Sequence, residues 1–150
     1  MSLRARLMDD IKAAMKAGQS ERVAQLRAIT AKVKDLDVAA RAKDAVVSDE
    51  DILLALRSMI KSRSESVEMY TKGNRPELAE KEEREIETIR SYLPAELDDD
   101  TVKTAIKEAV AEVKAESMKD MGRVMAVLKK RFGAALNAAK ASAFVKEHLG

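Results

Sequence analysis

The segment between Ser117 and Gly133 is predicted to form a helix with one cationic face and one apolar face. At about 100° per residue, Lys119, Arg123 and Lys130 lie within about 40° of one another. The opposite side carries the apolar residues of the segment, namely Met121, Val124, Met125, Leu128 and Phe132. Clustered lysine and arginine side chains bind phosphate groups, so this cationic face is a candidate contact for the backbone of a nucleic acid.

Four further residues complete the candidate set, and they are Gly122, Lys129, Arg131 and Lys140. A glycine at position 122 costs a helix about 1 kcal/mol relative to alanine, so its presence there needs a reason. Tight packing against another helix is the simpler reason, and close approach of a ligand is the alternative. The two tyrosines and two phenylalanines lie on or beside predicted core stripes, so stacking on bases is not expected.

Other chemically reactive groups are sparse. The chain has no cysteine and a single histidine, His148, for which the sequence offers no partner in a metal site or a catalytic triad. It contains no glycine-rich phosphate loop and no dinucleotide fingerprint. The glutamates between residues 80 and 87 are expected on a solvated face rather than around a metal. The sequence therefore predicts no catalytic residue, no metal site and no cofactor.

One charged pair is expected inside a helical hairpin. A turn at Gly73-Asn74 would fold the helix after Ser48 back on the helix that precedes Pro94. Arg63 would then face Glu82 or a neighbouring glutamate, on stripes that point into the hairpin. We interpret Arg63 and Glu82 as a structural ion pair that fixes the hairpin register, rather than as an anion site.

Every regular element of the chain is predicted to be a helix. The chain of 150 residues is 46% hydrophobic and 36% charged, with two prolines, and it has no strand-like alternation. Seven helices are expected, with N-caps at Ser2, Ser20, Ser48, Asn74 and Ser117. The acidic run Asp98-Asp99-Asp100 is expected at the N-terminus of the fifth helix, where negative charge is favourable. Leu93-Pro94 should end the fourth helix. The predicted fold is all-α, with a four-helix domain at 1–93 and a three-helix bundle at 94–150.

Charge is distributed unevenly along the chain. Residues 1–43 carry 10 Lys and Arg against 5 Asp and Glu, and residues 117–150 carry 7 against 2. The blocks between them, 44–92 and 93–116, are each net −4. The basic blocks could form a surface for a polyanion, or helices of opposite sign could simply attract one another. The absence of cysteine, of a signal-like apolar run and of a spanning segment favours a cytoplasmic protein that does not enter a membrane.

Several short motifs together resemble the YqeY family over essentially the whole chain. They are Leu26-Arg27, Lys61-Ser62-Arg63 with Ser66 and Tyr70, Gly73-Asn74-Arg75, Leu78-Ala79-Glu80-Lys81-Glu82, Glu85-Ile86, Tyr92-Leu93-Pro94, and the run from Ser117 to Met125. From about Leu97 the chain is also similar to the tail domain of the B subunit of the bacterial tRNA-dependent amidotransferase. One departure is the segment Ala134-Ala135-Leu136-Asn137, where the family usually has an Arg-Ala-Asp-Gly-like turn.

The resemblance implies a GatB/YqeY-type helical protein whose C-terminal part helps to hold tRNA. It also brings a family label of carbon-nitrogen ligase activity with glutamine as amido-N-donor, although catalysis is not expected from this chain alone. The leading hypothesis is a tRNA-binding or tRNA-enzyme accessory protein, with tRNA or a tRNA-handling enzyme as partner and no DNA. The alternative is a noncatalytic helical protein-protein interaction module. The oligomeric state stays open, with a monomer as the default.

Overall fold

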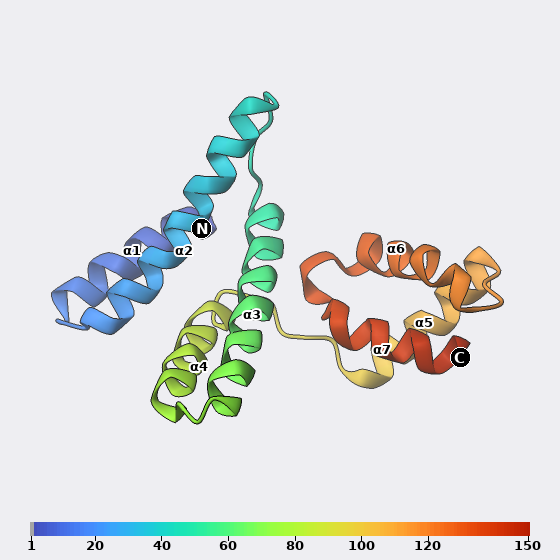
Figure 1. Cartoon of the computed structure of the whole chain (residues 1–150). Coiled ribbons are helices and arrows are strands. Elements are labelled where there is room, and N and C mark those ends of the chain that lie inside the picture. Colours follow the sequence, from blue (N-terminus) through green and yellow to red (C-terminus); the bar gives the residue numbers. More distant parts are fainter. Residues whose placement is uncertain (1) are drawn as a thin grey trace. The chain divides into compact units, whose positions relative to one another are not determined.

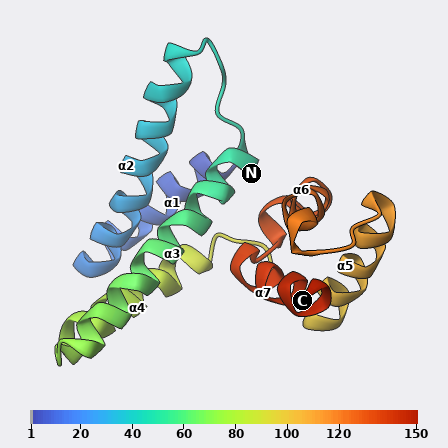
Figure 2. The same cartoon turned by 45° about the vertical axis from the view of Figure 1, so that its right-hand side comes forward.

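The computed structural model describes residues 2–150, and every regular element within that range is helical. The contacts between helices divide the chain into two compact units, residues 1–93 and 94–150. Each unit has its own hydrophobic core. Figures 1 and 2 show the first unit from blue to yellow-green and the second from yellow to red.

The first unit is built from two helical hairpins (Figure 1). Helices α1 (Leu3–Lys16) and α2 (Ser20–Ala42) form one of them, and α3 (Asp49–Lys72) and α4 (Pro76–Arg90) form the other. Helix α2 also packs against α3 and α4, which joins the hairpins. The core between them consists of Leu7, Ala14, Leu26, Ile29, Val33, Ile52, Leu56, Ile89 and Tyr92. These residues recur at the three- and four-residue spacing that the sequence predicts for inward faces.

The second unit contains three α-helices and two short 3₁₀ helices. Helix α5 (Asp99–Val113) is followed by a 3₁₀ turn (Met118–Asp120) and α6 (Met121–Phe132). A second 3₁₀ turn (Gly133–Ala135) leads into α7 (Ala138–Leu149). All three α-helices contact one another. Their core contains Val102, Ala105, Ile106, Ala109, Val124, Met125, Leu128, Leu136, Ala141 and Val145.

Most of the predicted helix starts are confirmed at the level of individual hydrogen bonds. The side chains of Ser2 and Asp98 accept from the backbone N–H of residues three positions later. Ser48 and Ser117 each form a reciprocal capping box with an aspartate, Asp51 and Asp120 respectively. Such boxes satisfy backbone donors that the first turn of a helix leaves free.

Two predicted caps are wrong. Helix α2 begins at Ser20 itself, and the residue before it, Gln19, makes no side-chain cap. The turn between α3 and α4 places Asn74 in the left-handed region, with φ 58°, whereas Gly73 has φ −81°. Arg75 then precedes the helix and Pro76 is its first residue. Asparagine tolerates the left-handed conformation better than most residues, so the adjacent glycine is not required to adopt it.

Candidate nucleic-acid interface

Helix α6 owes its position to a local capping system and to one apolar stripe. Ser117 and Asp120 start the segment as a single 3₁₀ turn, after which α6 continues to Phe132. Val124, Met125 and Leu128 are buried in the core of the second unit. The opposite face of the helix is therefore held toward solvent. Its exposed residues are Gly122, Arg123, Ala126, Lys129 and Lys130, with Lys119 in the preceding turn.

The cations predicted for this face divide into two groups. Arg123, Arg131 and Lys140 have acidic partners within the second unit. By contrast, Lys119, Lys129 and Lys130 are exposed and form no side-chain ion pair or hydrogen bond with other residues of the described range 2–150. Lys129 and Lys130 also lie in the last turn of α6, where positive charge interacts favourably with the helix dipole. The sequence does not distinguish the two groups, because the partners of Arg131 and Lys140 come from a different helix.

Arg123 joins the start of α6 to the end of α5. Its Nη2 atom lies 2.8 Å from the carbonyl oxygen of Val113 and 3.2 Å from Oδ1 of Asp120. Asp120 in turn accepts from the backbone N–H of Glu116 at 2.9 Å. That hydrogen bond, helped by the N–H of Ser117 and by Arg123, holds the pKa of Asp120 below its usual value. Arg123 therefore has a structural role that the amphipathic pattern does not indicate.

The other two pairs connect α5 to its neighbours. Arg131 pairs with Glu108, and its guanidinium also lies 5.0 Å from the ring centre of Phe132. Lys140 Nζ lies 2.7 Å from Oδ1 of Asp99. All four of these charged side chains are about half exposed. Exposed ion pairs contribute roughly 0–1 kcal/mol, so an incoming phosphate could displace the carboxylates at small cost.

Gly122 has no internal packing role. A Cβ atom built on Gly122 would meet no heavy atom within 4 Å. The prediction of tight helix packing at this position is therefore wrong, because the residue points to solvent. Gly122 and Ala126, one turn later, have no large side chain, so a ligand can approach the helix backbone closely there. Lys119, Lys129 and Lys130 lie beside this surface. Nothing within the described chain accounts for a glycine there.

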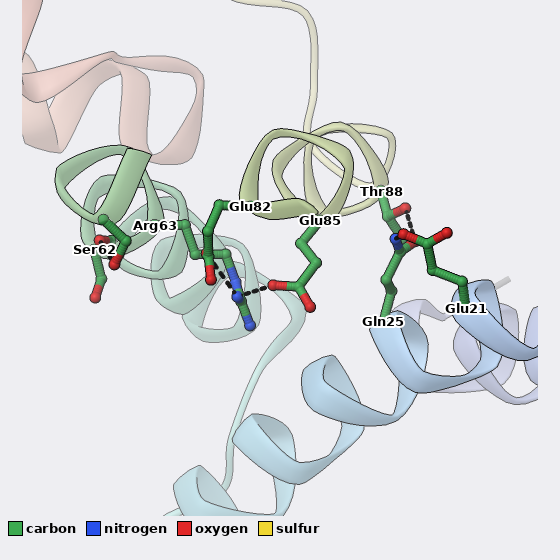
Figure 3. A network of polar contacts seen from close by, with 8 residues as sticks. Glu21, Gln25, Ser62, Arg63, Glu82, Glu85 and Thr88 are labelled. Carbon is green, nitrogen blue, oxygen red and sulfur yellow. Dashed lines mark hydrogen bonds and ion pairs between the residues drawn. The ribbon is translucent and has the colours of Figure 1, made fainter. Parts of the chain in front are cut away.

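The Arg63 site lies in the first unit and has a different character. Figure 3 shows the guanidinium of Arg63 from α3 directed at two carboxylates of α4. Its Nη1 atom lies 3.0 Å from Oε2 of Glu82, and it also pairs with Glu85. Less than a quarter of each of these side chains is exposed. One cation shared by two acids offers no surplus positive charge for an anion, so we expect the cluster to fix the register of the α3–α4 hairpin.

Two further polar contacts are not evident in the sequence. The Thr88 hydroxyl donates to Oε1 of Gln25 at 2.5 Å, and both residues are buried between α2 and α4 (Figure 3). The Tyr92 hydroxyl donates to Asp10, and the guanidinium of Arg6 lies 4.4 Å from the Tyr92 ring centre. Burial, with the nearby Asp10, raises the pKa of Tyr92 above its usual value. These partners lie more than 60 residues apart, so no local pattern could have paired them.

Residues 2–150 carry neither a metal-binding cluster nor a membrane-spanning helix. Within that range no group of three or more His, Asp or Glu side chains is arranged to hold a metal ion. None of the helices described combines the length and apolarity that crossing a bilayer requires. His148 is exposed near the end of α7.

Comparison with known proteins gives three informative relatives. An uncharacterized protein of Schizosaccharomyces pombe is 33% identical over 92 residues, which cover 61% of this chain and 69% of that protein. A protein of Lachancea thermotolerans named altered inheritance of mitochondria protein 41, mitochondrial, is 39% identical over 90 residues, or 59% of this chain and 46% of its own length. Its namesake in Pyrenophora tritici-repentis is 30% identical over 133 residues, or 84% of this chain and 71% of its own.

Two of these names specify mitochondria, a compartment that the sequence-based expectation of a cytoplasmic protein does not include. None of the three names states a reaction or a substrate. The family model described as Yqey-like protein matches residues 4–149, which is nearly the whole chain. The chain therefore belongs to the YqeY family, as its motifs indicate.

Proposed function

We propose that this protein is a noncatalytic accessory factor that binds tRNA through the exposed face of α6. The observation that carries the proposal is the combination of three lysines without acidic partners and a glycine without an internal role. Lys119, Lys129 and Lys130 extend to solvent, and Gly122 leaves the helix backbone accessible between them. The resemblance of the C-terminal part to a tRNA-holding tail domain supports tRNA as the ligand.

The chemistry of this face is suited to phosphate rather than to bases. Its polar groups are ammonium donors, and no aromatic side chain lies among its exposed residues. Without aromatic stacking, affinity depends on charge and on the fit to the backbone of a folded RNA. Binding should be strongly salt-dependent and only weakly selective for sequence. A helix surface lowered by Gly122 allows a sugar-phosphate backbone to lie close to α6.

The test is a titration of the full chain with unmodified tRNA at several salt concentrations. The variant K119A/K129A/K130A is expected to bind roughly tenfold more weakly at low salt, because three phosphate contacts are lost. The magnitude of the slope of log affinity against log salt should fall by about 2.1–2.7, since each of the three contacts contributes about 0.7–0.9. The matched control K61A/K72A/K81A removes three exposed lysines from α3 and α4 and should leave both quantities unchanged.

Two results would contradict the proposal. Equal slopes for the α6 variant and its control would show that these lysines do not contact RNA. Glutamine hydrolysis or amide transfer by the purified chain would contradict the noncatalytic assignment, which rests on the absence of a predicted catalytic constellation. Circular dichroism spectra of both variants should match that of the parent, because all six lysines are exposed.

A further inference from the structure

A groove in the first unit lies between the second half of α2 and the first half of α3. Its volume is about 560 Å³. The floor is apolar and is formed by Leu36, Ala39 and Ala40 of α2, Val47 of the connecting segment, and Leu54 and Ala55 of α3. Leu54 is 48% exposed, and Val46 beside it is 91% exposed. The groove is therefore an apolar surface that the first unit does not bury.

The groove arises because α2 is longer than the helix that covers it. The inward stripe of α2 is buried at Leu26, Ile29 and Val33, and continues at Leu36 and Ala40 with the same spacing. The first turn of α1 reaches Asp37 of α2, whose carboxylate pairs with Arg4 at 2.6 Å. Figures 1 and 2 both show the last turns of α2 extending beyond the start of α3, with residues 43–48 leading back.

On its α2 side, the charged residues that line the groove are all positive. Lys32 and Lys43 line the groove, and neither makes a side-chain ion pair with other described residues. The carboxylate that also lines it, Asp51, accepts the Ser48 N–H at 2.9 Å and belongs to the capping box of α3. The two lysines are about 16 Å apart along the helix axis, given about 1.5 Å rise per residue. An apolar floor favours an apolar ligand surface, and unpaired lysines beside it favour acidic groups on either side of that surface.

We propose that this groove binds an amphipathic helix of a partner protein, with acidic residues flanking its apolar face. The apolar side chains of that helix would cover Leu54 and the alanines of α2, and its carboxylates would pair with Lys32 and Lys43. The α2 wall between these lysines spans about three turns, so a partner helix of three to four turns fits it. This proposal does not depend on the proposed RNA binding, which would involve residues 94–150.

The test uses a displayed library of helical peptides of about four turns, selected on the immobilised full chain. Every peptide carries the same apolar stripe at the spacing of helix-in-groove ligands, and the flanking positions are randomised among Glu, Gln and Lys. Enrichment of Glu is expected. An enriched peptide, labelled with fluorescein, is then titrated with the parent and three variants. L54E places a charge in the floor, K32E/K43E reverses the edge, and V38E alters an exposed α2 residue that does not line the groove.

The peptide should bind L54E and K32E/K43E at least tenfold more weakly than the parent, and V38E within twofold. Exchanging Glu for Lys in the peptide should restore binding to K32E/K43E but not to L54E. No enrichment, enrichment of Lys, or equal binding to L54E would overturn the proposal. Concentration-dependent dimerisation of the parent, abolished in L54E, would also overturn it, because the occupant would then be a second copy. Circular dichroism verifies that each variant remains folded.

Discussion

The glycine at position 122 can be explained either by packing within the protein or by a ligand, and a single substitution distinguishes the two. It has helical geometry inside α6, and an added methyl group would contact nothing. The change G122A is therefore expected to stabilise the protein by about 0.5–1 kcal/mol, because alanine favours the helix more than glycine. Urea unfolding of the variant and the parent measures this difference.

The same variant should bind tRNA more weakly if a sugar-phosphate backbone approaches α6 at this position. A gain in stability together with a loss of affinity would be the signature of a glycine retained for a ligand. A matched control is A126G, one turn away on the same exposed face, which should lose stability by a similar amount without a loss of affinity. If G122A proves destabilising, the assignment of an open surface is wrong.

Exposed cations on one helix face can differ strongly in how available they are to bind a ligand. Arg123 and Lys130 are neighbours on the predicted cationic face, yet Arg123 holds Asp120 and the Val113 carbonyl while Lys130 has no such bond within the described range. A guanidinium presents several donors in a fixed fork and can hold two acceptors at once. A lysine ammonium on a flexible chain stays available for ligands. In the proposed RNA complex we therefore expect the lysines of this face to make most of the phosphate contacts.

A charged cluster around Arg63 connects α3 to α4, and we expect it to contribute to their alignment. Arg63 bonds to Glu82 and Glu85 in a partly dry interface. The change R63M should destabilise the protein by about 1–3 kcal/mol, because it leaves two carboxylates close together without a cation. Chemical denaturation followed by circular dichroism measures the loss.

The triple change R63M/E82M/E85M is the informative comparison for this cluster. Apolar side chains of similar size should recover most of the lost stability, since a buried ion pair seldom exceeds a hydrophobic contact in net value. If the triple variant recovers the stability that R63M loses, the cluster determines how the helices align and adds little net stability. If R63M alone has no effect, the ion pairs are too well solvated to matter.

The sequence predicts helices well where the signal is local. Capping boxes such as Ser48 with Asp51, and apolar stripes such as that of α6, depend on residues within one or two turns. Ion-pair partners from other helices, such as Glu108 for Arg131, depend on how helices pack, and no short window contains them. The groove beside α2 likewise depends on the relative lengths of α1 and α2, so amphipathicity alone does not reveal it.

The whole molecule carries its two candidate surfaces on different units. The lysines of α6 belong to residues 94–150, and the groove of α2 and α3 belongs to residues 1–93. A cationic face and an apolar groove select different classes of partner. The two proposals therefore concern separate surfaces, one for RNA and one for a protein helix. The two sets of variants described above should therefore affect tRNA and peptide binding independently.

Acid should weaken both units through the aspartates at their helix starts. Hydrogen bonds from Ser48 lower the pKa of Asp51, and bonds from Thr101 lower that of Asp98. The backbone N–H of Glu116 contributes most to the lowered pKa of Asp120. A carboxyl whose pKa is lower in the folded state than in the unfolded chain stabilises the fold above the unfolded value. That stability is lost as the pH falls from about 4 through the folded pKa.

The variant D51N/D98N/D120N should therefore lose less stability than the parent between about pH 5 and pH 2. Asparagine keeps a cap acceptor but cannot be protonated in this range, so stability at neutral pH should fall only modestly. Thermal unfolding at several pH values measures both effects. The control D9N/D35N/D100N changes three exposed aspartates for which the structure gives no side-chain hydrogen bond, and it should keep the acid sensitivity of the parent. An identical pH profile for the two variants would show that acid acts on the molecule through other groups.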